Sequence, residues 1–368
     1  MNATPPHGEQ AQSQADLRAG NYRARAIALY LPQFHPIPEN DEWWGPGFTE
    51  WTNVTRARPL FRGHVQPHLP ADLGFYDLRL AEVRDAQAEL ARAHGIEAFC
   101  YWHYWFGDGR RILERPFQEV LDSGAPAIKF CLGWANESWT GIWHNAQDRV
   151  LVEQRYPGKE DTDAHFTALV PAFRDQRYLR VNGRPVFHVY RPGGLPNAAQ
   201  FVDDWQARAR LAGLPGLYLV AGLGHGYERF AEDGFDSGFH SRLPYVPPQG
   251  LQLVRRFRRR VLKQPLVHRY SDAPLADVDA DRPGVQPCVI PNWDNTPRSG
   301  RHGVVLTGAT PERFRVHLRS AIGRLSTSPP EERLLWVKSW NEWAEGNYLE
   351  PDLDDGHAKL KVLKEELQ

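Results

Sequence analysis

The chain has 368 residues, a length that suits one (β/α)8 barrel with long insertions better than two small domains. Hydrophobic residues make up 41% of it and charged residues 24%, so it can build a full core, which excludes a chain disordered throughout. Its formal net charge of -1 argues against a nucleic-acid partner held by phosphate contacts and suits a neutral substrate.

Residues 1–24 are expected to form a disordered lead-in, because their start is rich in Gln, Ala, Pro and Asp. They contain no apolar stretch of the kind that marks a signal peptide. No run in the chain reaches the roughly 18 apolar residues that a membrane span needs. The sequence therefore predicts a cytoplasmic protein without a membrane span, whose single domain covers residues 25–368.

Short apolar runs then alternate with amphipathic stretches, a pattern typical of a parallel sheet covered by helices. Eight strands are predicted, at residues 26–33, 98–105, 128–134, 185–190, 217–221, 236–240, 287–293 and 334–340. The clearest helices are predicted over 78–94, 198–211 and 311–325, with Gly95, Gly213 and Gly323 near their ends. The count of eight strands favours an α/β fold of the closed (β/α)8 TIM barrel class with long βα loops.

Two features that could indicate other partners are interpreted as structural. Cys100, Cys131 and Cys288 all lie in apolar runs, and their number and spacing suit buried small hydrophobes instead of disulfides or a zinc site. The basic stretch 255–260 has apolar residues at helical spacing around it, which favours a solvated helix face over a nucleic-acid or membrane surface.

Aromatic and polar residues follow several of the predicted strands, at 33–36, 101–105, 134–139 and 291–295, and the chain holds 13 Trp but one Met. In a barrel the C-terminal ends of all strands converge on one face, so these residues should line one pocket. Carboxylates there can move protons, amides can hold hydroxyls, and indole faces can cover the apolar side of a sugar ring. The pattern indicates an oligosaccharide or polysaccharide substrate.

The last predicted strand leads into Asn341, Glu342, Trp343 and, three residues after Glu342, Glu345. Glycoside hydrolysis usually needs two carboxyl groups that flank one bond. By itself such a pair more often marks a solvated turn. The sugar-binding chemistry at the other strand ends favours a catalytic pair.

Several motifs in order carry a family resemblance: residues 28–36 (ALYLPQFHP), 43–45 (WWG), 48–54 (FTEWTNV), 66–70 (QPHLP), 101–106 (YWHYWF), 134–137 (WANE) and 340–346 (WNEWAEG). Together they resemble the WbsX domain family, which is related to glycoside hydrolase family 99, a family of (β/α)8 endo-α-mannosidases. The resemblance runs from about residue 25 to residue 351, nearly the whole chain.

The resemblance implies catalytic roles for two residues. The E-x-x-E pair of family 99 falls on Glu342 and Glu345. Glu345 would be the general acid that protonates the departing glycosidic oxygen. Glu342 would be the base that takes the proton of the sugar's own 2-hydroxyl, giving a 1,2-anhydro sugar that water opens with overall retention. That route needs a 2-oxygen anti to the leaving group, as in α-manno and α-rhamno sugars.

Other site residues follow from the strand-end pattern and the resemblance. Glu137, next to Asn136, is a rival for the role of acid, because an Asn-Glu pair ends a strand in many retaining glycosidases; Glu50 is as readily a helper as a loop residue. Substrate contacts are expected from Tyr30, His35, Trp51, His103, Tyr104, Trp134, Asn136, Glu137, Trp293, Asn341 and Trp343. No cofactor is expected. No metal is expected either, because His35, His64, His68 and His103 lack ligand spacing.

The sequence predicts a retaining glycoside hydrolase acting on an α-linked manno- or rhamno-configured bacterial polysaccharide of the O-antigen or exopolysaccharide type. The alternative is a glycosyltransferase of polysaccharide assembly, which normally needs a diphosphate site. Residues 352–354 (Asp-Leu-Asp) have the D-x-D form of such a site, but lie in an acidic tail without a phosphate cradle. A non-catalytic sugar-binding protein is a third reading. Oligomeric state is not indicated.

Overall fold

The computed structural model describes residues 23–141, 150–224, 226–241, 264–272 and 282–368. Nearly all of the expected lead-in, up to residue 22, and the basic stretch 255–260 lie outside the described residues. The description below concerns the part of the chain within these ranges.

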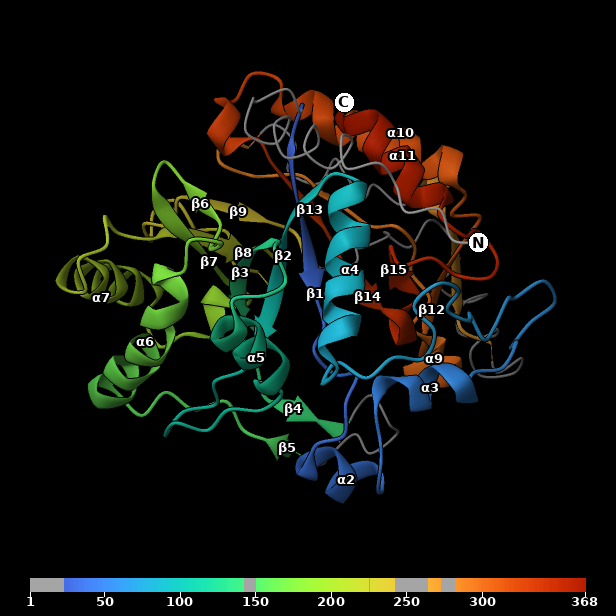
Figure 1. Ribbon diagram of the computed structural model, residues 1–368, viewed down its shortest axis with the longest axis horizontal. Coiled ribbons are helices and arrows are strands. Elements are labelled where there is room, and N and C mark those ends of the chain that lie inside the picture. Colours follow the sequence, from blue (N-terminus) through green and yellow to red (C-terminus); the bar gives the residue numbers. More distant parts are fainter. Residues whose placement is uncertain (1–22, 142–149, 225, 242–263, 273–281) are drawn as a thin grey trace.

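Within this part of the chain, parallel strands form a barrel at the centre of the molecule (Figure 1). In chain order they are β1 (Arg25–Tyr30), β2 (Ile96–His103), β3 (Lys129–Trp134), β7 (Arg184–Val189), β8 (Tyr218–Gly222), β9 (Ser237–Phe239), β11 (Cys288–Val289) and β13 (Leu334–Val337). Their spatial order is β11-β13-β1-β2-β3-β7-β8-β9. All eight predicted strands are confirmed, although most end earlier than predicted.

The two ends of this sheet meet and close the barrel. The Gly238 amide in β9 donates to the carbonyl of Gly284 (3.0 Å), and the Gln286 amide donates back to Gly238 (2.8 Å), just before β11. The strands are almost completely buried because their outer face is covered by helices and their inner face by the opposite strands. Cys100, Cys131 and Cys288 are buried and free, as predicted.

Six longer helices surround the barrel in Figure 1. They are α4 (Ala81–Ala93), α5 (Arg115–Ser123), α6 (Lys159–Arg174), α7 (Ala198–Leu211), α10 (Pro311–Leu325) and α11 (Ala358–Leu367). The predicted bounds of α7 and α10 are confirmed. Gly95 and Gly213 follow helix ends with positive φ, whereas Gly323 lies inside α10. No helix in the described ranges combines the length and apolar character that a bilayer span requires.

Shorter elements gather near the C-terminal ends of the strands, below and beside the arrowhead of β1 in Figure 1. They include α2 (Pro38–Trp44), α3 (Glu50–Arg56), α9 (Thr296–Ser299) and the strand pairs β4 (Trp139–Thr140) with β5 (Val150–Val152) and β14 (Asn341–Glu342) with β15 (Asn347–Tyr348). Two further small strands pair with each other elsewhere, β10 (Leu266–Arg269) and β12 (Val304–Thr307), and β6 (Arg180–Val181) extends β7.

Trp336 in β13 is a strong test of barrel packing, because it is fully buried, stacks on Phe239 (ring centroids 4.2 Å) and donates from Nε1 to Gln286 (2.7 Å). We expect Trp336→Ala to lower the free energy of unfolding by about 3–5 kcal/mol. Urea unfolding measures it. Val316→Ala, at a position 65% exposed, is the control and should change stability by less than about 0.5 kcal/mol. A small effect at Trp336 would contradict the packing described here.

Candidate active site

A cavity of about 750 Å³ opens at the C-terminal end of the barrel. This volume lies within the range of about 300–1,000 Å³ that small-molecule sites occupy. Residues that follow seven of the eight barrel strands line it, namely Leu31, Tyr104, Glu137, Tyr190, Ser241, Trp293 and Lys338. The strand ends therefore converge on one cavity.

Glu342 and Glu345 lie on a tight turn that enters this cavity. Glu342 ends β14, and Glu345 ends the 3-10 turn η6 (Trp343–Glu345). Because a 3-10 helix has three residues per turn, positions three apart lie on the same side. The Ser339 hydroxyl accepts the Glu342 amide (2.9 Å), and Gly346 ends the turn with a left-handed φ of 58°. The turn thus holds both carboxyl groups together, with exposures of only 7% and 6%.

Asp294 braces this turn from the loop after β11. Its backbone amide donates to the Glu345 carbonyl (2.6 Å). Its carboxylate accepts hydrogen bonds from His64 and Gln66 (both 2.7 Å) and from the Thr296 hydroxyl (2.6 Å). Four donors that include a backbone amide hold the pKa of Asp294 below its ordinary value, although burial opposes this. Asp294 is therefore a buried carboxylate whose backbone amide fixes the position of Glu345.

Arg298 of α9 joins three glutamates in the cavity. Its guanidinium pairs with both oxygens of Glu50 (3.0 and 2.7 Å) and with Glu345 (2.7 Å), and lies 3.7 Å from Glu342. Asn53, one turn after Glu50 on α3, donates to the Glu50 carboxylate (2.8 Å). Burial opposes the positive charge, but the glutamates outweigh it and raise the pKa of Arg298. The guanidinium is permanently charged and fixes α3, α9 and η6 around the carboxyl pair.

The two carboxyl groups are not equivalent. Burial, and then the negative charge of Glu345, raises the pKa of Glu342 to about 8. Burial also disfavours the charged form of Glu345, but Arg298 and a hydrogen bond from Glu342 outweigh it and lower the pKa of Glu345. Near neutral pH the pair therefore holds one proton between its members, and that proton resides on Glu342.

Lys338 adds a second cation from the end of β13. Its ammonium lies over the Trp293 ring, 5.4 Å from the ring centroid, and Lys338 is only 7% exposed. Burial disfavours its charge, yet the nearby Glu342 and Glu345 raise the pKa of Lys338, so the ammonium stays protonated. Lys338 therefore places a positive charge in the cavity lining beside the two carboxyl groups.

The cavity lining also contains a partly exposed ion pair and several aromatic rings. Glu137 pairs with Arg191 at 3.0 Å, and both are about one-third exposed. Asn136 clamps the Arg191 backbone by accepting its amide and donating to its carbonyl, both at 2.8 Å. The aromatic residues that line the cavity are Trp44, Trp102, Tyr104, Trp139, Tyr190 and Trp293. Such rings can cover the apolar faces of a sugar.

The structure separates the predicted site residues into two groups. Five of them line the cavity together: Tyr104, Glu137, Trp293, Glu342 and Glu345. Glu50 also lines it. Eight others, all within the described ranges, do not line it: Tyr30, His35, Trp51, His103, Trp134, Asn136, Asn341 and Trp343. Their contacts show that they support the cavity from behind.

Three of these eight lie beside the first strand and α3. The Tyr30 hydroxyl donates to Gln87 (2.6 Å) between the barrel and α4. His35 Nδ1 bonds to the backbone carbonyl three residues earlier (3.0 Å), and Trp51 donates from Nε1 to the Tyr76 carbonyl (2.8 Å). The Tyr30 hydroxyl, His35 Nδ1 and Trp51 Nε1 thus bond to protein groups, whereas His35 Nε2 is buried without a partner among the described residues.

His103 and Trp134 end β2 and β3 on the helix side of the barrel. His103 Nε2 lies 2.8 Å from Nε2 of His165 on α6, and burial lowers the pKa of His103 to about 3, so the imidazole is neutral. Trp134 packs edge-on against His165 (4.7 Å) and donates from Nε1 to the Trp105 carbonyl (3.0 Å). These residues anchor α6 to the barrel.

Asn341 and Trp343 hold the turn that carries Glu342 and Glu345. Asn341 clamps Leu31 after β1, accepting its amide (2.8 Å) and donating to its carbonyl (3.0 Å). Trp343 stacks on Tyr348 (3.9 Å between ring centroids) and donates from Nε1 to the buried Glu350 (2.6 Å). Both residues fix the position of Glu342 without facing the cavity.

The cavity lining also contains residues that the sequence did not predict, among them Tyr190, Arg191, Arg298 and Lys338. Lys338 carried a usable signal, because it is the one charged residue in the predicted strand 334–340. Arg298 carried no such signal in the sequence. It lies on the short helix α9, between Pro297 and Gly300, and its role depends on a contact with Glu50, which is 248 positions away in the sequence.

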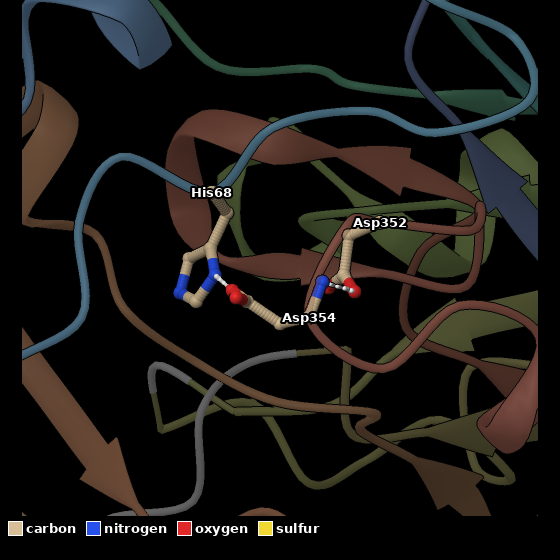
Figure 2. Close-up of side chains that lie close together, drawn as sticks. All are labelled: His68, Asp352 and Asp354. Carbon is tan, nitrogen blue, oxygen red and sulfur yellow. Dashed lines mark hydrogen bonds and ion pairs between the residues drawn. The ribbon is translucent and has the colours of Figure 1, made fainter.

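One group of described residues has the composition of a metal site. His68, Asp352 and Asp354 place ligand atoms within 4.8 Å of one another (Figure 2). His68 bonds to Asp354 (3.2 Å), and Asp352 accepts the Asp354 amide (3.0 Å) and the Tyr348 hydroxyl (2.6 Å). These bonds close the loop after β15, and none of the three residues lines the cavity.

Comparison with known protein families identifies the family of this chain. The family described as Glycosyltransferase WbsX matches residues 26–363. The chain belongs to this WbsX family. It is 40% identical, over 356 residues, to proteins named WxcX from two strains of Xanthomonas campestris pv. campestris. That alignment covers 94% of this chain, and the chain spans about half (50%) of the length of these relatives.

Solved structures with a similar fold include the family 99 endo-alpha-mannosidase of Bacteroides thetaiotaomicron, with a TM-score of 0.58 and 14% identity. The alignment covers 93% of this chain and 95% of that one. A structure described as a glycoside hydrolase-like protein aligns with a TM-score of 0.58, 12% identity and 94% coverage of both chains. At such identities the likeness establishes the shared barrel fold.

The raised pKa of Glu342 predicts how pH affects stability. An unfolded glutamate titrates near 4.5 and the folded one near 8, so the stability due to its protonated form is lost as pH rises through about 8. Gln cannot ionise. Relative to the parent protein, Glu342→Gln should therefore gain about 1–3 kcal/mol between pH 5 and pH 9. Urea unfolding at both pH values measures this change.

Glu350, whose pKa burial raises to about 7, is present in both proteins and cancels from the comparison. A stability difference that does not change with pH would contradict the protonated state of Glu342.

Proposed function

We propose that the protein is a retaining glycoside hydrolase that acts on α-linked manno- or rhamno-configured bacterial polysaccharide of the O-antigen or exopolysaccharide type. The observation that carries this proposal is the buried, hydrogen-bonded pair of Glu342 and Glu345, which holds one proton in a sugar-sized cavity. Glycoside hydrolysis needs one proton donor and one proton acceptor beside one bond. The fold shared with endo-alpha-mannosidases supports the same assignment.

In the proposed reaction the protonated glutamate gives its proton to the glycosidic oxygen as the bond from that oxygen to the anomeric carbon breaks. The charged glutamate takes the proton of the sugar's 2-hydroxyl, and the 2-oxygen closes on the anomeric carbon. Water then opens the 1,2-anhydro sugar. The first glutamate takes a proton from that water, and the second returns its proton to the 2-oxygen, which restores the starting state with retention.

The charges in the cavity favour one assignment of these roles. Glu342 has the raised pKa of a general acid, whereas Glu345 is held as a carboxylate by Arg298 at 2.7 Å. We therefore propose Glu342 as the acid and Glu345 as the base, the reverse of the assignment that the family resemblance implies. Glu137 is less suited to the role, because it lies outside the buried pair, is about one-third exposed and is bound to Arg191 at 3.0 Å.

The substrate class follows from the proposed route. The 2-oxygen can displace the leaving group only when the two are anti, as in α-manno and α-rhamno sugars. Tyr104, Trp102 and Trp293 provide rings in the cavity that can face such pyranoses.

Glycosyl transfer is the alternative that the family's description favours. A nucleotide-sugar transferase would need a site for a diphosphate. The D-x-D at 352–354 lies outside the cavity lining, and both carboxylate oxygens of Asp352 accept hydrogen bonds from its own loop and Tyr348. These contacts support hydrolysis over transfer.

A substrate panel separates the two functions. α-Mannan and rhamnan oligosaccharides are incubated with the protein, with and without nucleotide sugars, and the products are followed by mass spectrometry. We expect shorter oligosaccharides to appear without any nucleotide sugar. The double variant Glu342→Gln, Glu345→Gln is the control and should release none. Elongated products that require a nucleotide sugar would establish transfer instead.

Single variants of the pair test the roles. Glu342→Gln and Glu345→Gln should each lower turnover of a natural glycoside by about 10²- to 10⁴-fold, because each removes one positioned proton transfer. An aryl glycoside with an activated leaving group needs little protonation. We therefore expect it to restore much of the activity of Glu342→Gln and little of that of Glu345→Gln.

The leaving-group comparison has two informative alternatives. Rescue of Glu345→Gln alone would return the role of acid to Glu345, as in the family resemblance. Rescue confined to Glu137→Gln would make Glu137 the acid. Full activity in both variants of the pair would end the proposed mechanism.

A further inference from the structure

The cavity wall formed by β9, β11 and β13 carries hydrogen-bond donors that the protein itself does not use. These strands lie next to one another in the barrel, and Ser241, Trp293 and Lys338 follow their C-terminal ends. Among the residues that the structure describes, the Ser241 hydroxyl and Trp293 Nε1 are buried without a hydrogen-bond partner. A buried polar group without a partner is costly, so a ligand is the natural source of acceptors.

Lys338 is the charged member of this set. It is more than nine-tenths buried, and no described carboxylate lies within ion-pair distance of its ammonium, whose contact is the face of Trp293. The two nearest candidates are engaged elsewhere. Glu345 pairs with Arg298 at 2.7 Å, and Glu342 carries the proton of the pair. A buried cation of this kind is stabilised by an anion that binds beside it.

The other cations of the cavity are already paired. Arg298 contacts Glu50 and Glu345, and Arg191 contacts Glu137. Lys338 is thus the cation, within the described lining, that remains available to an acidic group of a ligand.

We propose that the cavity takes a sugar that bears a carboxylate, which binds the ammonium of Lys338 together with the Ser241 hydroxyl and the Trp293 indole N–H. The inference rests on the proposed sugar chemistry of this site and narrows its substrate to acidic, uronate-containing polysaccharide. The three donors follow adjacent strands of the barrel, and charge-assisted bonds are the strongest hydrogen bonds that a site can offer.

The test is direct binding, which does not depend on turnover. Three probes of the same ring configuration are titrated by calorimetry at pH 7 in dilute salt: methyl α-D-mannopyranosiduronate, its uncharged uronamide, and methyl α-D-mannopyranoside. We expect the uronate to bind about 10- to 100-fold more tightly than either neutral sugar, as a hydrogen bond to a charged group implies. The preference should shrink as salt is added.

Two variants locate the effect. Lys338→Met should abolish the preference for the uronate over the uronamide, and its melting temperature shows whether it is folded. Lys361→Met removes the same charge from an exposed position on α11 and should keep the preference. If Lys338→Met does not fold, the comparison of uronate with uronamide in the parent protein still decides the question.

The outcomes separate this inference from the proposed function. Equal affinity for all three sugars would overturn the carboxylate site, show that Lys338 is only a counter-charge to the glutamates, and leave hydrolysis untouched. A preference that survives in Lys338→Met would overturn it as well. Failure of all three sugars to bind would overturn the carboxylate site and leave the hydrolase to the cleavage assay, whereas selective uronate binding without any oligosaccharide cleavage would remove only the hydrolase.

Discussion

The ion cluster of Arg298 with Glu50 and Glu345 is the interaction on which the cavity depends. Its members come from α9, α3 and the turn after β14, segments separated by up to 295 positions (345 minus 50). Removing one partner of a buried cluster leaves a charge without compensation and typically costs several kcal/mol. The cluster also determines which of Glu342 and Glu345 carries the proton that they share. Because Arg298 stabilises the charged form of Glu345, the neighbouring Glu342 remains as the protonated member.

A second layer of polar contacts keeps that geometry rigid. Asp294 holds the Glu345 backbone, and Asn341 ties the turn that carries Glu342 to the end of β1. Glu350 accepts hydrogen bonds from Trp343, Tyr76 and Gln87. Burial raises the pKa of Glu350 to about 7. Catalytic groups must stay within a fraction of an ångström of their working positions, which buried networks with fully used partners provide. Many residues of the family motifs serve this support.

Periodicity and strand-end chemistry were enough to predict the barrel, because each strand is a buried apolar run whose end must open on one face. The same reasoning placed Tyr104, Glu137, Trp293, Glu342 and Glu345 in one cavity. It could not decide which neighbours turn inward: His103 faces α6 while Trp102 and Tyr104 line the cavity. That choice depends on strand tilt and helix packing. Arg298 is recognisable only through partners distant in the sequence.

The charge distribution also bears on the choice between hydrolysis and transfer. Four glutamates are among the described residues that line the cavity, and two of its cations, Arg298 and Arg191, are already paired with them. A nucleotide-sugar donor would bring a diphosphate into this field, where Lys338 is the one cation among the described lining residues without an ion-pair partner. Placing two more negative charges beside buried carboxylates without new cations would cost more than one ammonium returns. A sugar with no charge, or with one carboxylate, fits the same field.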